Sequence, residues 1–277
     1  MKNILVPTDF SDASTNAVEY AAALAQDFQA KLILLNVVAP RVVIEDISAT
    51  AYLITEAELS ENNKKLMKNE IIRLSEKYHI LVEAYLRKGL PTEVIEEFSA
   101  SKRADIVVMG MKGKGKSNSK FGSTTTMLIR KSDIPVLVIP KKARFEPIRQ
   151  ITFASEFVMS HADYWVLDEF AEKYDSSINV LNVQKNRQLV EVENAIGKTE
   201  ADLSFAKFNH RFESYESDKL EKGIEEYLKL NPSNMLAMVA HKHSFLKRTF
   251  GTIHTKNMCY QTLIPLLVFP AKRGVNQ

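Results

Sequence analysis

Short apolar runs alternate with amphipathic stretches through the first half of the chain. The apolar runs carry few charges and are too short for helices, which is the pattern of buried strands in a parallel sheet. We expect strands at Ile4–Val6, Leu32–Val38, Leu81–Leu86, Ile106–Met109 and Pro135–Ile139. Apolar residues recur at helical spacing between these runs. The predicted helices include Ala17–Phe28, Glu56–Tyr78, Val94–Phe98 and Ser123–Lys131, while residues 39–55 show no regular period and receive no element.

This alternation predicts an α/β fold with a doubly wound, mostly parallel, Rossmann-like sheet of five strands. In the simplest strand order, 3-2-1-4-5, the order reverses between the first and fourth strands. Ligands of such sheets bind beyond the carboxyl ends of the strands, at the reversal. We therefore expect Pro7–Asp9 and Gly110–Gly113 to share one crevice.

The second half repeats the pattern of the first. A third helix at Leu220–Leu230 and a fourth strand at Met235–Val239 complete the second copy, and Asn182 stands where the first copy has Asn36. The matching segments are Gln150–Phe157 with Asn3–Phe10, Ile178–Val183 with Leu32–Val37, Phe250–Thr252 with Phe121–Ser123, and Leu263–Lys272 with Asp133–Lys142. We predict two domains of one fold, at residues 1–142 and 148–273.

Composition narrows the class of protein. The 277 residues are 45% hydrophobic and 26% charged, and the net charge of +3 is too small to argue for nucleic acid. A single cysteine excludes a disulfide framework within the chain. No apolar run reaches the roughly 18 residues of a membrane span, and the first residues lack the apolar region of a signal peptide. We expect a cytoplasmic protein that binds neither nucleic acid nor membrane.

One loop, between the fourth strand and the last helix of the first half, carries the clearest candidate chemistry. It contains Gly110, Gly113, Gly115 and Gly122 together with Lys112, Lys114, Lys116 and Lys120. Glycines let backbone N–H groups approach a phosphate closely, and a helix that starts at Gly122-Ser123 adds free N–H groups and a favourable dipole. The loop therefore predicts a site for the phosphates of a nucleotide.

These residues resemble the universal stress protein family. The resemblance rests on ILVPTDFSD at the start, GLPTEVIEEFSASKRADIVVMG before the loop, the glycine loop, and IPVLVIP after it, and it covers the whole first half. The ATP-binding branch of that family carries G-x2-G-x9-G-(S/T), whereas only eight residues separate Gly113 from Gly122 here. The resemblance implies an adenine nucleotide alpha hydrolase-like fold and binding of ATP, ADP or AMP, with or without magnesium.

The resemblance also implies roles for individual residues. Asp9 would face the ribose and adenine, and the backbone of Val37 or Val38 would contact adenine. The glycine loop would wrap the phosphates. The expected cofactor-binding residues are Pro7, Thr8, Asp9, Val37, Val38, Met109, Gly110, Gly113, Gly122, Ser123 and Thr124. We predict no catalytic residue.

Two alternatives remain open for the same loop. Gly110-x4-Gly115-Lys116-Ser117 fits the Walker A pattern, which would make the protein a slow magnesium-dependent ATPase. Against this, the helix starts later, at Gly122-Ser123, and no later strand ends in an aspartate suited to magnesium. Alternatively, Asp9 is only a helix cap and the lysine-rich loop is only solvated. The protein would then be a ligand-free interaction module.

The second copy differs from the first at the glycine loop. Ala240 and His243 stand where the first copy has Gly110 and Gly113, so we expect weak or no nucleotide binding there. We expect this copy to pack against the first as a pseudo-dimer within the chain, and two chains can also pair as a homodimer. His241, His243, His254 and Cys259 lack a metal-binding spacing, and no metal site is predicted. The sequence favours a nucleotide-binding regulatory module of the stress response.

Overall fold

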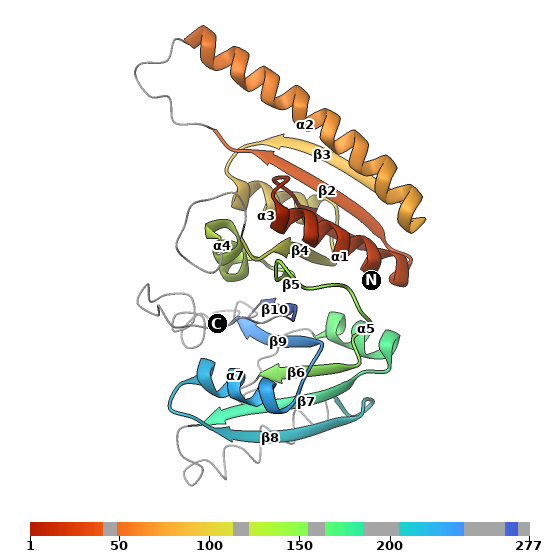
Figure 1. Cartoon of the computed structure of the whole chain (residues 1–277), viewed down its shortest axis with the longest axis vertical. Helices are drawn as coiled ribbons and strands as arrows, with labels where there is room; N and C mark the ends of the chain where they lie inside the picture. The colour runs from red at the N-terminus through yellow and green to blue at the C-terminus, as the bar shows by residue number, and fades with distance from the viewer. Residues whose placement is uncertain (41–48, 113–121, 155–163, 185–204, 241–263, 271–277) are drawn as a thin grey trace, which may run out of the picture. The chain divides into compact units, whose positions relative to one another are not determined.

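The computed structural model describes residues 1–40, 49–112, 122–154, 164–184, 205–240 and 264–270, with the side chains of 49–58 left out. The chain divides into two compact units, Met1–Leu128 and Ile129–Gln277. Each has its own sheet strands and covering helices (Figure 1). Within the described part of the chain, no helix combines the length and apolar character that crossing a bilayer requires.

The first unit alternates strands and helices in the predicted way. Its strands lie side by side in the order β3-β2-β1-β4, and every pair is parallel. β1 therefore lies between β2 and β4, which confirms the predicted reversal beside β1 and brings the carboxyl ends of β1 and β4 together. The elements are β1 (Asn3–Pro7), α1 (Asp12–Phe28), β2 (Lys31–Val38), α2 (Ala49–Tyr78), β3 (Val82–Lys88), α3 (Pro91–Ser101), β4 (Ile106–Gly110) and α4 (Ser123–Lys131).

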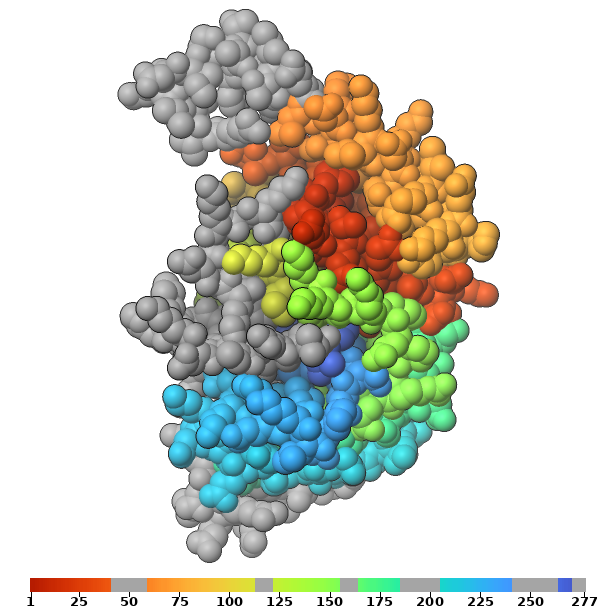
Figure 2. Space-filling view, in the orientation of Figure 1, coloured from red at the N-terminus to blue at the C-terminus, as the bar shows by residue number. Residues whose placement is uncertain are grey.

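The prediction of α2 was wrong at its amino end. The helix begins at Ala49 rather than at Glu56, and it covers β2 and β3 (Figure 1). A helix is predicted from a sequence by apolar residues that recur at helical spacing. That pattern starts only at Leu59, whereas Ala49–Ile54 is helical without it. The space-filling view shows α2, in orange, at the surface of this unit (Figure 2).

One carboxylate joins α1 to α2. Glu19 of α1 accepts hydrogen bonds from Lys77 Nζ at 2.8 Å, from Tyr78 Oη at 2.5 Å, and from Arg73. Burial raises the pKa of Glu19, but the three hydrogen bonds outweigh this and lower it to about 2. Glu19 is therefore ionised in the folded protein through the neutral and mildly acidic range.

The second unit contains the same strand order as the first, because β8-β7-β6-β9 corresponds to β3-β2-β1-β4. Its strands run β5-β10-β9-β6-β7-β8, all pairs being parallel except β5 with β10. β5, which the sequence places in the first repeat, thus pairs with the last strand of the chain. The elements are β5 (Val136–Ile139), β6 (Gln150–Ala154), α5 (Trp165–Tyr174), β7 (Ser177–Gln184), β8 (His210–Glu216), α7 (Leu220–Leu230), β9 (Met235–Ala240) and β10 (Leu266–Pro270).

The predicted α/β class with mostly parallel sheets is confirmed. One strand, β8, was not predicted from the sequence. β8 has the sequence HRFESYE, without an apolar run, and lies at the end of the strand order. A strand with one neighbour and partial exposure needs few apolar residues, so its pattern gives no signal. The core of the unit lies instead in β6, β7, β9 and β10, whose apolar residues are buried.

Candidate functional site

A cavity of about 350 Å³ opens at the carboxyl ends of β1 and β4. Residues from β1, β2 and β4 and from the first turns of α1, α3 and α4 line it. They are Pro7, Thr8, Asp9, Ser14, Leu35, Val37, Ala39, Pro91, Ile95, Met109, Gly110, Lys112, Gly122, Ser123, Thr124 and Thr125. The cavity therefore lies at the strand-order reversal, where sheets of this kind hold their ligands.

All but two of the cofactor-binding residues predicted from the sequence line this cavity. Val38 does not line the cavity, and Gly113 lies outside the described residues, as do Lys116 and Ser117. Lys112, which sequence analysis placed in the phosphate-binding loop, also lines the cavity, and the residues that sequence reasoning missed are Ser14, Leu35, Ala39, Pro91, Ile95 and Thr125. Most of them sit on helices or inside β2, where only the packing of the elements reveals which side chain faces the cavity.

The loop after β1 forms one wall of the cavity through a compact turn. The Thr8 N–H donates to the Leu35 carbonyl at 2.9 Å and so makes the last rung between β1 and β2. The Phe10 N–H donates to Thr8 Oγ1 at 3.2 Å, and the Ser11 N–H donates to Asp9 Oδ1 at 3.0 Å. Phe10 has φ of 56°, in the left-handed region that costs a non-glycine residue free energy. These bonds hold a strained turn in place at the rim of the cavity.

Ser11 caps α1 and ties this helix to the same wall. Ser11 Oγ accepts from the Ser14 N–H at 3.3 Å, and Ser14 Oγ donates to the Ser11 carbonyl at 3.0 Å. Thr8 Oγ1 donates to Ser14 Oγ at 3.2 Å, and both side chains are buried. The end of β1 and the first turn of α1 therefore form one hydrogen-bonded wall.

Gly110 ends β4 between two helices. A Cβ atom there would lie 2.6 Å from the Ala13 carbonyl oxygen, so the backbone of β4 meets α1 more closely than a side chain permits. On the other side, Thr125 Oγ1 of α4 donates to the Gly110 carbonyl at 3.1 Å. Glycine is needed at this position because the two helix starts converge on it.

The amino end of α4 lies at the cavity. The helix begins at Ser123, as predicted, and the first-turn residues Ser123, Thr124 and Thr125 all line the cavity. N–H groups in a first turn have no partner within the helix, and the helix dipole favours negative charge there. This end of the cavity is therefore suited to an anion.

Another part of the cavity lining is apolar. It includes Leu35 and Val37 of β2 and Pro91 and Ile95 of α3. Backbone groups point to alternate sides along a strand, so the N–H of Val37 points to the side on which the Leu35 carbonyl meets β1. β1 has already ended there at Pro7. A flat apolar ligand at this part of the lining would meet one outward-pointing backbone N–H.

Val38 differs from Val37 for the same reason. Its backbone groups point toward β3, and its carbonyl accepts from the Gly89 N–H at 3.1 Å. The side chain of Val38 is buried in the core. Of the two residues that sequence analysis nominated for contact with adenine, only Val37 is placed at the cavity.

The lining of the cavity also carries charge. Asp9 brings one carboxylate and Lys112 one ammonium group to its lining. Among the residues that the structure describes, no three His, Cys, Asp or Glu side chains gather as a metal site requires. The residues considered for zinc, His241, His243, His254 and Cys259, lie outside the described ranges. The described residues thus offer an anion site, an apolar slot and a hydrogen-bonding carboxylate.

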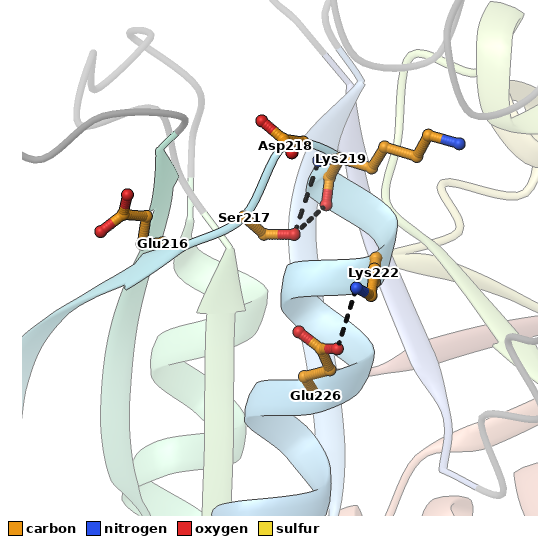
Figure 3. A pocket seen from close by; sticks show the side chains of 6 residues that line it. All are labelled: Glu216, Ser217, Asp218, Lys219, Lys222 and Glu226. Carbon is orange, nitrogen blue, oxygen red and sulfur yellow. Dashed lines mark hydrogen bonds and ion pairs between the residues drawn. The ribbon is translucent and has the colours of Figure 1, made fainter.

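A second hollow, in the other unit, has a different character. It lies between the end of β8 and the start of α7 and is lined by charged residues and one serine (Figure 3). Lys222 Nζ lies 3.4 Å from Glu226 Oε1, and Ser217 Oγ donates to the Lys219 carbonyl at 3.0 Å. The lining contains no apolar side chain to enclose a ligand. We therefore take the cavity of the first unit as the candidate site.

Comparison with known proteins gives a consistent result. The model of the universal stress protein family matches residues 1–140. Universal stress protein MJ0577 of Methanocaldococcus jannaschii is 30% identical over 51% of this chain and 96% of its own length. Universal stress protein Slr1230 of Synechocystis is 24% identical over 97% of this chain and its full length. A universal stress protein structure from Archaeoglobus fulgidus covers 96% of this chain and 97% of its own, with a TM-score of 0.70 at 16% identity, a likeness of fold.

Proposed function

The chain belongs to the universal stress protein family, and from this premise we propose that its first half binds an adenine nucleotide, with ATP as the preferred ligand. One observation carries the proposal. A single cavity of about 350 Å³ combines an apolar slot with a helix amino end, which are the two environments that a nucleotide requires. Its volume lies within the roughly 300–1,000 Å³ of small-molecule sites.

The proposed pose follows from the chemistry of these two parts of the lining. The base lies between Leu35, Val37 and Ile95, and its ring edge accepts a hydrogen bond from the Val37 N–H. The Asp9 carboxylate accepts from a ribose hydroxyl. The phosphates lie at the first turn of α4, where N–H groups and hydroxyls of Ser123 and Thr124 are available. The glycine loop after Gly110 would complete the phosphate contacts, for ATP with or without magnesium.

The proposed role is regulatory, and the second half does not bind nucleotide. Ala240 ends β9 at the position that Gly110 occupies in β4, and its methyl group prevents so close a backbone approach. We propose domains at 1–142 and 148–273, packed as a pseudo-dimer, with nucleotide occupancy of the first domain as the signal. The described residues suggest binding and offer no activated nucleophile beside the cavity.

The test is calorimetric titration of nucleotide-stripped protein with ATP and with AMP, each with and without magnesium. Ser123→Asp places a carboxylate at the start of α4, where it suits the helix dipole but repels phosphate. We expect one site per wild-type chain and a loss of ATP affinity of at least tenfold in this variant. AMP, with one phosphate, should lose less. The matched control is Thr252→Asp, at the corresponding position of the second half, which should leave the affinity unchanged.

The other outcomes separate the alternatives. No binding at millimolar ATP would refute the proposal and favour a ligand-free interaction module. Two equal sites, or equal losses in Ser123→Asp and Thr252→Asp, would refute the asymmetry between the halves. Magnesium-dependent turnover that Lys116→Ala abolishes would identify an ATPase instead.

A further inference from the structure

Two linked hydrogen bonds, one partly buried and one buried, connect α2 to the wall of the cavity. Asn63 Nδ2 of α2 donates to Asn36 Oδ1 of β2 at 2.9 Å, and Asn36 Nδ2 donates to the Thr8 carbonyl at 2.7 Å. Asn36 is 3% exposed and Thr8 is 7% exposed. Asn36 is the polar residue within an otherwise apolar stretch of β2, Leu32–Val38. A buried amide in such a strand costs free energy unless it is fully bonded.

The Thr8 carbonyl determines which group donates and which accepts in both hydrogen bonds. A carbonyl oxygen can only accept, so the Asn36 atom facing Thr8 must be the NH2 group. Its oxygen then faces Asn63, which must donate in turn. A carboxylate or an aliphatic side chain at position 36 cannot perform both functions.

Asn36 lies behind the cavity rather than in it. Leu35 and Val37, its neighbours in β2, line the cavity, and side chains alternate between the faces of a strand. Asn36 therefore points to the opposite face, where it meets α2. Any effect of Asn36 on a ligand must act through another residue.

That other residue is Val37. The Thr8 N–H donates to the Leu35 carbonyl. If β1 and β2 stayed paired beyond this bond, the Val37 N–H would donate to the Thr8 carbonyl. The ladder between β1 and β2 ends before this rung, at Pro7 with Leu35. The Thr8 carbonyl is bonded to Asn36 Nδ2 instead. The two strands part at this point, and the cavity lies in the opening.

We infer that Asn36 is a positioning residue that holds the Thr8 carbonyl and so reserves the Val37 N–H for the ligand. The consequence for the ligand rests on the proposed function, whereas the effect on the Val37 N–H does not. Through Asn63, the same bonds tie the opening between the strands to the position of α2. Without the amide, the buried Thr8 carbonyl lacks its donor, and the Val37 N–H is the group placed to replace it.

The experiment measures amide hydrogen exchange and nucleotide affinity in Asn36→Leu, which keeps the side-chain size and removes the hydrogen bonds. We expect the Val37 amide to exchange at least fivefold more slowly than in the wild type without ligand, because it now bonds to Thr8. Affinity for ATP should fall about tenfold. A merely structural loss would speed exchange at Val37. Asn36→Ala, free of steric conflict, should show the same slowing if the leucine variant fails to fold.

Asn182→Leu is the matched control, because it removes a buried amide from the corresponding strand of the second unit. It should change neither Val37 exchange nor ATP affinity. Slower Val37 exchange in the Asn36 variants, in a protein that binds no ATP, would uphold the positioning role and refute the proposed function. Unchanged or faster exchange at Val37 in both Asn36 variants would overturn the inference, whatever the affinity.

Discussion

Gly110→Ala tests whether the close approach of β4 to α1 shapes the cavity. The added Cβ would lie 2.6 Å from the Ala13 carbonyl oxygen and 2.8 Å from its carbon, whereas ordinary contacts begin at 3.4 Å. The obstacle is helix backbone, which cannot rotate away as a side chain can. One of the two elements must move by about 0.8 Å.

The cost follows from this displacement. Overpacking by one methyl group against a rigid neighbour destabilises by about 1–3 kcal/mol. The movement also weakens the hydrogen bond from Thr125 Oγ1 to the Gly110 carbonyl. It shifts the first turn of α1, which places Ser14 in the cavity lining. We therefore expect the first unit to lose about 2 kcal/mol of stability and ATP to bind more weakly.

Amide hydrogen exchange resolves the effect to one unit. The free energy of opening should fall by about 2 kcal/mol for the buried amides of β4 and stay unchanged for those of β9. Ala240→Gly, the reverse exchange at the matching end of β9, should leave β4 unaffected. If β4 in Gly110→Ala stays within about 0.5 kcal/mol of the wild type, the close approach is not a packing constraint and our account of this glycine is wrong.

Three further predictions concern other parts of the molecule. Thr125→Val should cost about 1 kcal/mol in denaturant unfolding and weaken ATP binding several-fold in calorimetry, because it leaves the Gly110 carbonyl without its donor; unchanged affinity would contradict this. The low pKa of Glu19 means that its stabilisation, about 2 kcal/mol after allowance for solvent screening, is present above about pH 4.5 and is lost as pH falls toward 2. Glu19→Gln should therefore flatten the acid limb of a stability–pH curve, and a limb as steep as in the wild type would refute the assignment. Phe153→Ala, at a fully buried aromatic contact of the second unit, should cost about 3–5 kcal/mol in unfolding followed by Trp165 fluorescence, while a loss of ATP affinity would argue against a site confined to the first unit.

The sequence alone determined the fold class and the place of the candidate site. Apolar runs that are short and nearly free of charge identify buried parallel strands, because both faces of such strands are covered. The alternation with amphipathic helices predicts a doubly wound sheet, and the simplest strand order for such a sheet places a crevice at the reversal. Gly110 and Ser123 stood out in the sequence because their chemistry is local: a missing side chain and a helix start.

Tertiary structure decided which neighbouring residues serve the cavity. Val37 and Val38 are equivalent in the sequence. Backbone groups alternate in direction along β2, however, so those of Val37 point to the opening and those of Val38 point to β3. β8 stayed hidden because a strand with a single neighbour needs no apolar run. The role of Asn36 depends on Thr8 and Asn63, which lie 28 and 27 positions away. A hydrogen bond between distant residues leaves no periodic mark on the sequence, so only the folded chain reveals it.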